Sequence, residues 1–494
     1  MATLIVSLRV DASELVRSTN PVRWVLAGVG ALLARFDLVS AERARETTDL
    51  AWPRIVTGLA RMSKGVADVA MVGVALGPTA IAGMGFAGPY WGMTFAVGGG
   101  MAAGTIALVS QRFGAGAHDE LGQVVRSSAA FVTAISVPVA LLFWLFPAPL
   151  VDLLSDDPGA VAYGADYLRV LAVGVPFAVL NQIGSRVLVG ANDAWTPMVV
   201  RSTGAVTNVA LNAVFVFALD MGVVGAALGT VLAGVLVTTA FVVGLAYGRL
   251  PLVGAFPIQV NWVGSYVDRG LFADLASIGL PVVGRSSVWT VARFPILALV
   301  GALGSHVVAA YVISRRIWGL MNTPGWGFGL AASSLVGQSL GAGDEETAEA
   351  YGREITTFTV AVYVLAAVVV AVFARPIVGL FVNDPTSQAV PVAVTLVHAA
   401  CIAVVPQGVT SAVAGALDAT GDTNWPFYGR AIGMFGLAIP LVYLAATTPL
   451  GLLGVSLSFL AESVPGALVN YYRFRSGKWK AISRGYRPGT AADD

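Results

Sequence analysis

The sequence predicts an all-α membrane protein whose twelve transmembrane helices form two parallel six-helix repeats. A run of residues occurs twice in the chain: Ala107 to Gly116 reads ALVSQRFGAG, and Ser334 to Gly343 reads SLVGQSLGAG, 227 positions later. Hydrophobic residues make up 56% of the 494 residues and charged residues 12%, about half the charged fraction of a soluble domain. Long internal repeats in an apolar chain are typical of transporters built from two lobes.

Further matched pairs extend the repeat over most of the chain. They are Leu76-Gly77 with Leu303-Gly304, Pro197 and Arg201 with Pro426 and Arg430, and Gly222, Gly225 and Leu228 with Gly451, Gly454 and Leu457. Their offsets are 227 or 229 residues, so each position in one half has a twin in the other half. We interpret the two Gly-Ala-Gly turns as helix stops.

Helices that span a bilayer need about 20 apolar residues, and twelve segments meet this length. The first six are 55–76, 88–109, 125–146, 167–189, 198–219 and 224–246. The second six are 276–300, 308–336, 355–373, 389–416, 426–446 and 451–472. Six spans per lobe is an even number, so both lobes have the same orientation in the membrane and the repeats are parallel.

The domain organisation follows from these spans. We expect an N-lobe at 50–247, a cytoplasmic linker at 248–274, a C-lobe at 275–475 and a cytoplasmic tail at 476–494. One set of connections is rich in arginine, whereas the opposite set carries Asp152, Asp156, Asp157, Asp220 and Asp384 with only Arg375. Because positive residues stay on the inner side, both termini are predicted to be cytoplasmic, and the protein to lie in the plasma membrane.

Residues 1–49 form a separate N-terminal segment. Its apolar stretch, 22–34, has 13 residues and is short for a transmembrane span. A signal peptide is disfavoured because Asp11 and Glu14 lie where such a signal needs positive charge. We therefore expect an interfacial helix on the inner leaflet.

Polar residues that one lobe has and its twin lacks are the candidates for function. Asp68 has the twin Pro295, and Thr230 has the twin Phe459. The twins of Asn208 and Asn212 are Leu437 and Leu441. Asn208 and Asn212 are four residues apart and therefore share one helix face.

The four N-lobe residues together suit a small cation. A carboxylate with amide and hydroxyl oxygens offers hard ligands for a metal ion such as Na⁺. Burial disfavours a charged carboxylate, so Asp68 could instead cycle protons. A carboxylate inside a membrane helix is a functional hypothesis by default. The alternative is structural, with Asp68 capping a local break and Asn208 holding it.

The C-lobe carries its own charges in Arg285, Arg293 and Glu462, whose twins are Gly58, Val66 and Ala233. We expect a C-lobe charge network in which Arg293 and Glu462 pair directly or share a bridging water, because each is costly in the membrane if it has no partner. Direct binding of substrate by the arginines is the alternative.

Each of the two six-helix lobes has a Gln-x-x-Gly-Ala-Gly turn that closes its second helix and a Pro-x-x-x-Arg that opens its fifth. In this combination the chain resembles the multidrug and toxic compound extrusion (MATE) family, in its archaeal-type branch. The resemblance covers Trp52 to about Lys480. It implies a V-shaped pair of bundles and an N-lobe cation site at the positions of Asp68, Asn208, Asn212 and Thr230. Some archaeal-type members carry a second carboxylate where Asn212 stands.

The resemblance implies an antiporter that exports amphiphilic, often cationic, drugs or toxins in exchange for H⁺ or Na⁺. We expect no enzyme activity, no cofactor, no metal beyond a possible Na⁺ at Asp68, no nucleic-acid partner and a monomer. The net charge of +1 gives no indication of nucleic-acid binding. The alternative function is a flippase for lipid-linked sugars or other lipids in the same superfamily, which would need many arginines facing the cavity in both lobes.

Overall fold

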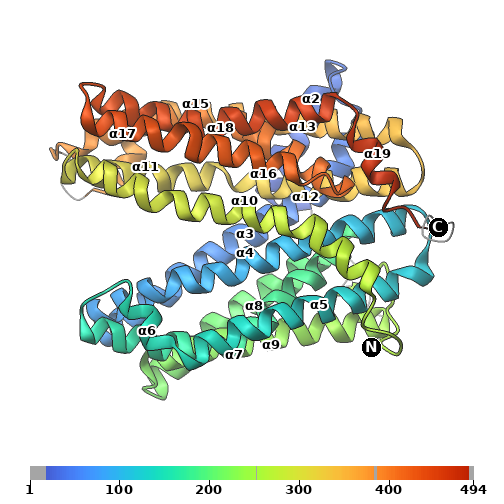
Figure 1. Ribbon diagram of the computed structural model, residues 1–494, viewed down its shortest axis with the longest axis horizontal. Coiled ribbons are helices and arrows are strands. Elements are labelled where there is room, and N and C mark those ends of the chain that lie inside the picture. Colours follow the sequence, from blue (N-terminus) through green and yellow to red (C-terminus); the bar gives the residue numbers. More distant parts are fainter. Residues whose placement is uncertain (1–17, 252, 383–385, 489–494) are drawn as a thin grey trace. The chain divides into compact units, whose positions relative to one another are not determined.

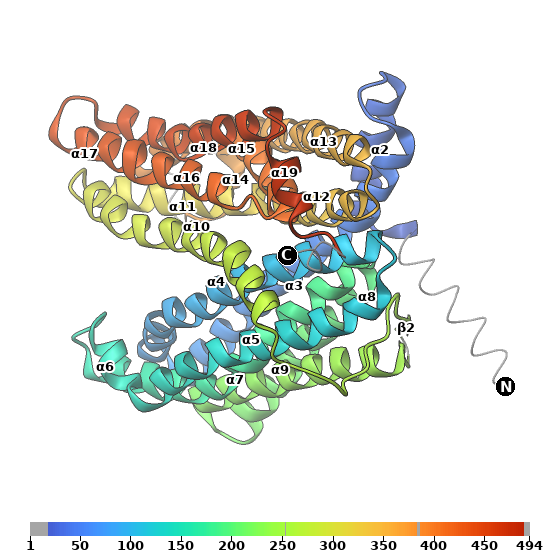
Figure 2. The same ribbon diagram turned by 45° about the vertical axis from the view of Figure 1, so that its right-hand side comes forward.

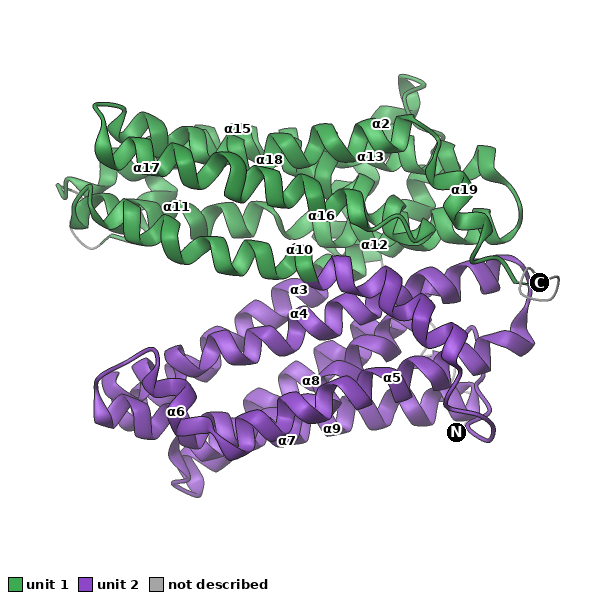
Figure 3. Ribbon diagram, viewed as in Figure 1, with its two compact units in different colours: residues 1–55, 284–494 green, residues 56–283 purple. Residues whose placement is uncertain are grey.

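The computed structural model describes residues 18–251, 253–382 and 386–488 and divides into two compact units. Unit 1 holds residues 1–55 and 284–494, and unit 2 holds residues 56–283 (Figure 3). The expected lobe limits at residues 50 and 275 lie inside two long helices, α3 (Ala41–Leu76) and α10 (Arg269–Gly301), and the unit boundaries fall a few residues later in the same helices. Asp11, Glu14, Asp384 and the last six residues of the expected tail lie outside the described residues.

Unit 2 consists mainly of helices that follow one another along the chain (Figure 1). After the second part of α3 come α4 (Pro78–Gly114), α5 (His118–Leu145), α6 (Pro147–Asp152), α7 (Pro158–Gly190), α8 (Trp195–Ala213), the π-helix η1 (Val214–Ala218) and α9 (Gly222–Tyr247). Two short antiparallel strands, β1 (Arg249–Leu250) and β2 (Gly254–Ala255), open the expected linker. The unit ends in the first part of α10.

Unit 1 begins with α2 (Pro21–Arg35) and the first part of α3. Its second portion holds the rest of α10, α11 (Ser305–Met321), α12 (Thr323–Gly341), α13 (Glu345–Val372), α14 (Ala374–Gly379), α15 (Ala389–Thr420), α16 (Asn424–Ala431), the π-helix η2 (Ile432–Ala438), α17 (Ile439–Thr447), α18 (Gly451–Arg475) and α19 (Trp479–Arg484). The fifth span of each repeat therefore contains a π-helix.

The repeated sequence motifs coincide with repeated turns. Gly77 and its twin Gly304 precede α4 and α11, with φ of 84° and 108°. Gly116 and Gly343, in the two Gly-Ala-Gly runs, have φ of 69° and 85°. Residues with a Cβ avoid these positive φ values, so glycine is needed at each turn. The interpretation of the Gly-Ala-Gly runs as helix stops is confirmed.

Ten helices of the described chain are long and apolar enough to cross a membrane. The remaining two predicted spans correspond to α3, which carries Arg61, Lys64 and Asp68, and to the pair α11 and α12, of 17 and 19 residues. The predicted eighth span is thus broken at Asn322, two residues before Pro324. A proline tolerated in the first turn of a helix explains the break at this place.

Small residues let the second and fourth spans of each repeat approach closely. In unit 2, α4 packs along α7, and a Cβ on Gly83 would lie 2.6 Å from the carbonyl oxygen of Ala160 (Figures 1 and 2). In unit 1, α12 packs on α15, and a Cβ on Gly415 would lie 2.1 Å from the carbonyl oxygen of Gly329. Packing through small residues is a common way for membrane helices to associate.

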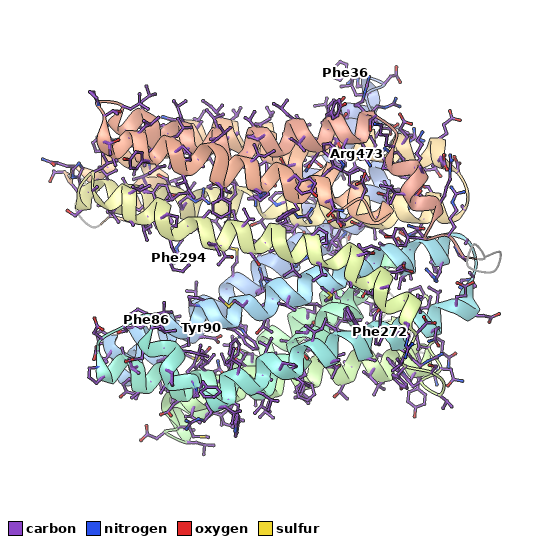
Figure 4. All side chains as sticks on the ribbon, in the orientation of Figure 1. Phe36, Phe86, Tyr90, Phe272, Phe294 and Arg473 are labelled. Carbon is purple, nitrogen blue, oxygen red and sulfur yellow. The ribbon has the colours of Figure 1, made fainter. Side chains whose placement is uncertain are left out.

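An apolar core fills each unit. In unit 2 it includes Tyr90 of α4, labelled in Figure 4, whose ring meets Phe143 of α5 edge to face. In unit 1 it includes Trp318 and the fully buried Tyr363. Large side chains dominate such cores because each removes much apolar surface from its surroundings.

The N-terminal helix predicted at 22–34 is present as α2. Asn20 caps it, since its side chain accepts hydrogen bonds from the backbone NH groups of Val22 and Arg23. α2 packs on α13, where Gly30 lies against Phe358. Its place on the inner leaflet stays a prediction. Nearby, Arg43 of α3 forms an ion pair with Glu354 of α13, so the first part of α3 packs with unit 1.

Replacing Gly415 by alanine should destabilise unit 1. The new methyl group has no room beside the Gly329 carbonyl, and overpacking of this kind costs about 1–3 kcal/mol. Gly319→Ala on α11 is the matched control, because its Cβ meets nothing within 4 Å. Thermal unfolding of the purified protein in detergent should show a lower Tm for the Gly415 variant only. Equal Tm values for the two variants would contradict the close helix contact.

Candidate functional site

Unit 2 contains a pocket of about 500 Å³, within the size range of small-molecule sites. Helices α3, α4, α7, α8 and α9 all contribute to its wall. Apolar and aromatic side chains make up much of it, including Ile81, Met84, Trp91 and Phe95 of α4 and Val237 of α9. Such a wall suits an amphiphile.

Asp68 lies on the wall of this pocket and is only 5% exposed. Its Oδ2 is 2.8 Å from the ammonium Nζ of Lys64, one turn earlier on α3. Its Oδ1 accepts a hydrogen bond of 2.8 Å from Nδ2 of Asn212 on α8. Both partners donate to Asp68, so this arrangement satisfies an ionised carboxylate.

The other predicted site residues continue this network. Asn212 Nδ2 lies 3.4 Å from Asn208 Oδ1, and Asn208 Nδ2 donates to Thr230 Oγ1 of α9 at 3.0 Å. Thr230 in turn donates to the backbone carbonyl of Ala226 at 3.1 Å. The structure therefore brings together all four residues predicted for the N-lobe cation site, and we call Asp68, Asn208, Asn212 and Thr230 the Asp68 cluster.

Close packing of α8 and α9 positions the amide of Asn212. A Cβ on Gly229 would lie 2.0 Å from Asn212 Oδ1, so only glycine leaves room for this side chain. Asn208 and Asn212 are both fully buried. The Oδ1 atom of Asn212 is buried and has no hydrogen-bond partner in the described part of the chain. An oxygen without a partner is costly in the apolar interior and is available to a ligand.

The sequence analysis missed Lys64, which completes the network. Besides its contact with Asp68, Lys64 Nζ lies 3.3 Å from Thr230 Oγ1. The comparison of twins would have found it, because the twin of Lys64 is Val291 and only the N-lobe carries the cation. Lys64 is also one of three lysines in the whole chain.

Arg61 and Arg201 also line the pocket. Arg61 of α3 lies 5.7 Å from the centre of the Phe95 ring, and its twin is Val288. Arg201 of α8 repels Arg61 electrostatically and has no acid or hydrogen-bond partner within the described ranges. With Lys64, the pocket lining therefore holds three basic side chains and one acid, Asp68.

In the C-lobe, an acid balances the charge of the arginine at the corresponding position. Arg430, the twin of Arg201, has its Nη1 3.8 Å from Oε1 of Glu462. The twin of Glu462 in the N-lobe is Ala233, which lines the pocket together with Arg201. The acid that balances Arg430 in the C-lobe is thus replaced by an alanine in the N-lobe pocket that Arg201 lines.

The C-lobe charges pair differently from the prediction. Glu462 is held by Arg315 of α11, with a shortest distance of 2.6 Å, and accepts a hydrogen bond of 2.8 Å from the indole of Trp289. Arg293 instead stacks on Trp289, with its guanidinium carbon 3.7 Å from the ring centre. The expected direct pair of Arg293 with Glu462 is therefore wrong. Arg315, 147 residues from Glu462, takes that place because α11 and α18 bring them together.

Arg285 likewise has an acidic partner in unit 1. Its two Nη atoms lie 3.2 and 2.8 Å from the two carboxylate oxygens of Asp418 on α15. Bidentate pairs of this kind fix the geometry of both side chains. Asp418 was missed because it follows the end of the predicted tenth span, at residue 416.

The MatE family model matches residues 53–214 and 281–444, which are the two halves of the repeat. The chain belongs to the MATE family. A probable multidrug resistance protein NorM from Bradyrhizobium diazoefficiens is 28% identical over 445 residues, which cover 88% of this chain and 94% of the relative. Members of this family are secondary transporters that need no cofactor, so the protein is a transporter and not an enzyme.

Solved MATE structures have the same fold. One, an outward-facing multidrug resistance transporter of the family, aligns with a TM-score of 0.80 at 21% identity, covering 89% of this chain and 96% of the other. A Pyrococcus furiosus transporter of the wider superfamily aligns with a TM-score of 0.78 at 20% identity, covering 88% and 96%. That transporter is described as having a binding pocket of reverse polarity that suggests a different function. The twelve-helix fold of two repeats is thereby confirmed.

Removing Arg315 should destabilise the protein more than removing Arg293. Arg315→Ala leaves Glu462 without its nearest cation, and breaking a buried pair costs about 3–5 kcal/mol. In a double-mutant cycle with Glu462→Ala, Arg315→Ala should show a coupling of about 1–3 kcal/mol, and Arg293→Ala a smaller one. Thermal stability in detergent measures both cycles. A stronger coupling to Arg293 would contradict the contacts described here.

Proposed function

We propose that this protein exports amphiphilic compounds in exchange for a cation, H⁺ or Na⁺, that acts at the Asp68 cluster. The position of Asp68 supports this most strongly, because it is a buried carboxylate, held by Lys64 and Asn212, on the wall of a pocket of ligand size. Membrane carboxylates are costly and usually functional. The Bradyrhizobium diazoefficiens relative is likewise a probable multidrug resistance protein.

The geometry suggests how cation and amphiphile would compete. Helices α3, α8 and α9 carry the Asp68 cluster, and the same helices form part of the pocket wall. Adding a cation to Asp68 changes the hydrogen bonds between these helices and therefore the shape of the pocket. A cation that favours one shape and an amphiphile that favours another lower each other's affinity, and such coupling is reciprocal.

The protein spans a membrane several times, and we propose that it lies in the plasma membrane with both termini in the cytoplasm. The arginine-rich connections support this orientation. A single chain carries both halves of the repeat, which supports a monomer as the working unit.

Replacing Asp68 by asparagine should abolish gradient-driven efflux and leave the protein folded. The amide keeps the size of the side chain but can neither take up a proton nor balance a cation. We would measure efflux of a fluorescent amphiphile from proteoliposomes under an imposed pH gradient and an imposed Na⁺ gradient. Asp156→Asn, an exposed acid outside the pocket lining, is the control. Wild-type efflux by the Asp68 variant would place the coupling site elsewhere.

The charge of the pocket favours a second candidate function, transport of an anionic lipid or lipid-linked sugar. Arg61, Lys64 and Arg201 outnumber Asp68, and the acid that balances Arg430 has no counterpart beside Arg201. This balance opposes a substrate with net positive charge, although the sequence led us to expect cationic drugs. In the C-lobe, Arg285 and Arg315 are paired with acids, so the basic lining supports this function in one lobe only.

Arg201→Gln should weaken binding of an anionic amphiphile by about ten-fold or more, because a hydrogen bond to a charged group contributes about 1.5–3 kcal/mol. Decanesulfonate and decyltrimethylammonium share the same chain and differ in the sign of the head group. Their competition with a fluorescent amphiphile, measured on protein in nanodiscs against empty nanodiscs, gives both affinities. Arg353→Gln, an exposed arginine outside the pocket lining, is the control. Tighter binding of the cationic compound would exclude the anionic substrate class.

A further inference from the structure

The ammonium group of Lys64 occupies the place that a free metal cation would take at Asp68. Its Nζ lies 2.8 Å from Asp68 Oδ2 and 3.3 Å from Thr230 Oγ1, a carboxylate and a hydroxyl oxygen of the predicted cation site. Carboxylate, carbonyl and hydroxyl oxygens are the ligands that hard metal ions prefer. The lysine therefore uses the same oxygens as the ion that the cluster would bind.

The cluster keeps oxygens that Lys64 does not satisfy. Asn212 Oδ1 is buried and has no hydrogen-bond partner among the described residues, although the same amide donates its NH₂ group to Asp68. Within the described residues, Asn208 Oδ1 accepts only the long contact of 3.4 Å from Asn212. The oxygens for a metal ion are thus present, and the tethered ammonium already neutralises their carboxylate.

Lys64 competes with a free cation on favourable terms. It stands four residues before Asp68 on the same helix, so the tether keeps the ammonium at a high effective concentration beside the carboxylate. A Na⁺ ion would join Lys64 at a single carboxylate, and like charges repel strongly in a low-dielectric site. The other ionisable groups of the described pocket lining are Arg61, Tyr167 and Arg201; α4 and α9 contribute none. The two arginines add further positive charge to the pocket lining.

We propose that Lys64 is a built-in counter-ion that replaces Na⁺ at the Asp68 cluster. The ammonium occupies the place of a metal ion, whereas a proton needs only one carboxylate oxygen, so H⁺ is the ion left for exchange. Loss of the Lys64 charge then opens a site for a monovalent metal cation, made by Asp68, Asn208, Asn212 and Thr230. The inference rests on the proposed function for its meaning in transport, whereas the metal binding itself needs no transport. Lys64 is a specificity-determining residue: it selects the coupling ion through its contact with Asp68.

Na⁺-dependent thermal unfolding of the purified full-length protein in nanodiscs tests this directly, with choline chloride replacing NaCl at constant ionic strength. The Tm of the wild type should be the same in both salts. Lys64→Gln should gain about 2–4 °C in saturating Na⁺, because a ligand that binds the native state stabilises it. The double variant Lys64→Gln with Asp68→Asn should lose this gain.

Three further variants distinguish the effect of removing the Lys64 charge from the effect of changing its side chain. Lys64→Arg keeps the cation and should not respond to Na⁺, and neither should Lys478→Gln, an exposed lysine on the C-terminal side of α18. Lys64→Met keeps the aliphatic chain and replaces Lys64→Gln if that variant does not fold; it should gain the Na⁺ response.

A Na⁺-specific rise in the Tm of the wild type would overturn the proposal, and this result does not depend on any variant. Folded Lys64→Gln or Lys64→Met protein that ignores Na⁺ would overturn it as well. Neither substrate nor gradient enters the measurement. Absence of amphiphile efflux would therefore refute the proposed function and leave the Na⁺ result unchanged.

Discussion

The ion pair between Lys64 and Asp68 is the interaction on which the N-lobe site depends. A carboxylate in an apolar helix bundle needs donors, and Asp68 obtains them from Lys64 on its own helix and from Asn212 on α8. Each donor imposes a further requirement. Asn212 needs a glycine at position 229 to fit against α9, and Lys64 needs the oxygen of Thr230 as a second acceptor. One buried charge thereby fixes the relative positions of three helices that form the pocket wall.

The two halves of the repeat share a fold but satisfy their charges by different chemistry. In the C-lobe, arginine holds two buried acids, with Arg315 on Glu462 and Arg285 on Asp418, each through two nitrogen atoms. A planar guanidinium fork locks a carboxylate in one geometry, whereas a lysine ammonium is a point charge on a flexible stem. This difference is consistent with a static role for the C-lobe pairs and a changeable one for the lysine pair of the N-lobe.

The sequence predicted the fold well because its signals are local. Apolar length located the spans, and the repeated glycines marked turns that need positive φ. The charged residues of α3 lower its hydropathy, so its start at Ala41 was not predicted. One of them, Arg43, pairs with Glu354 on a helix that is distant in the sequence. A hydropathy pattern carries no information about such a partner. The break between α11 and α12 at Asn322 was likewise hidden inside one predicted span.

The site was predicted only in part, because sequence patterns do not show which residues meet across helices. The comparison of twins found Asp68, Asn208, Asn212 and Thr230, which the structure brings together. It missed Lys64 and Arg61 because we compared only the acids and neutral polar residues of the N-lobe, although the twins Val291 and Val288 carried the signal. The partner of Glu462 could not be found in this way, because the choice of Arg315 over Arg293 depends on which helix faces meet.

The most direct test of the coupling is to drive protons with the amphiphile itself. Proteoliposomes without any pH gradient would be given an outward gradient of a fluorescent amphiphile, with a pH-sensitive dye in the lumen. Because coupling between two sites is reciprocal, we expect the lumen to acidify as the amphiphile leaves through the wild type, and the Asp68→Asn protein to give no pH change. Amphiphile movement through the wild type at constant luminal pH, with or without Na⁺, would contradict the central claim that a proton is exchanged at Asp68.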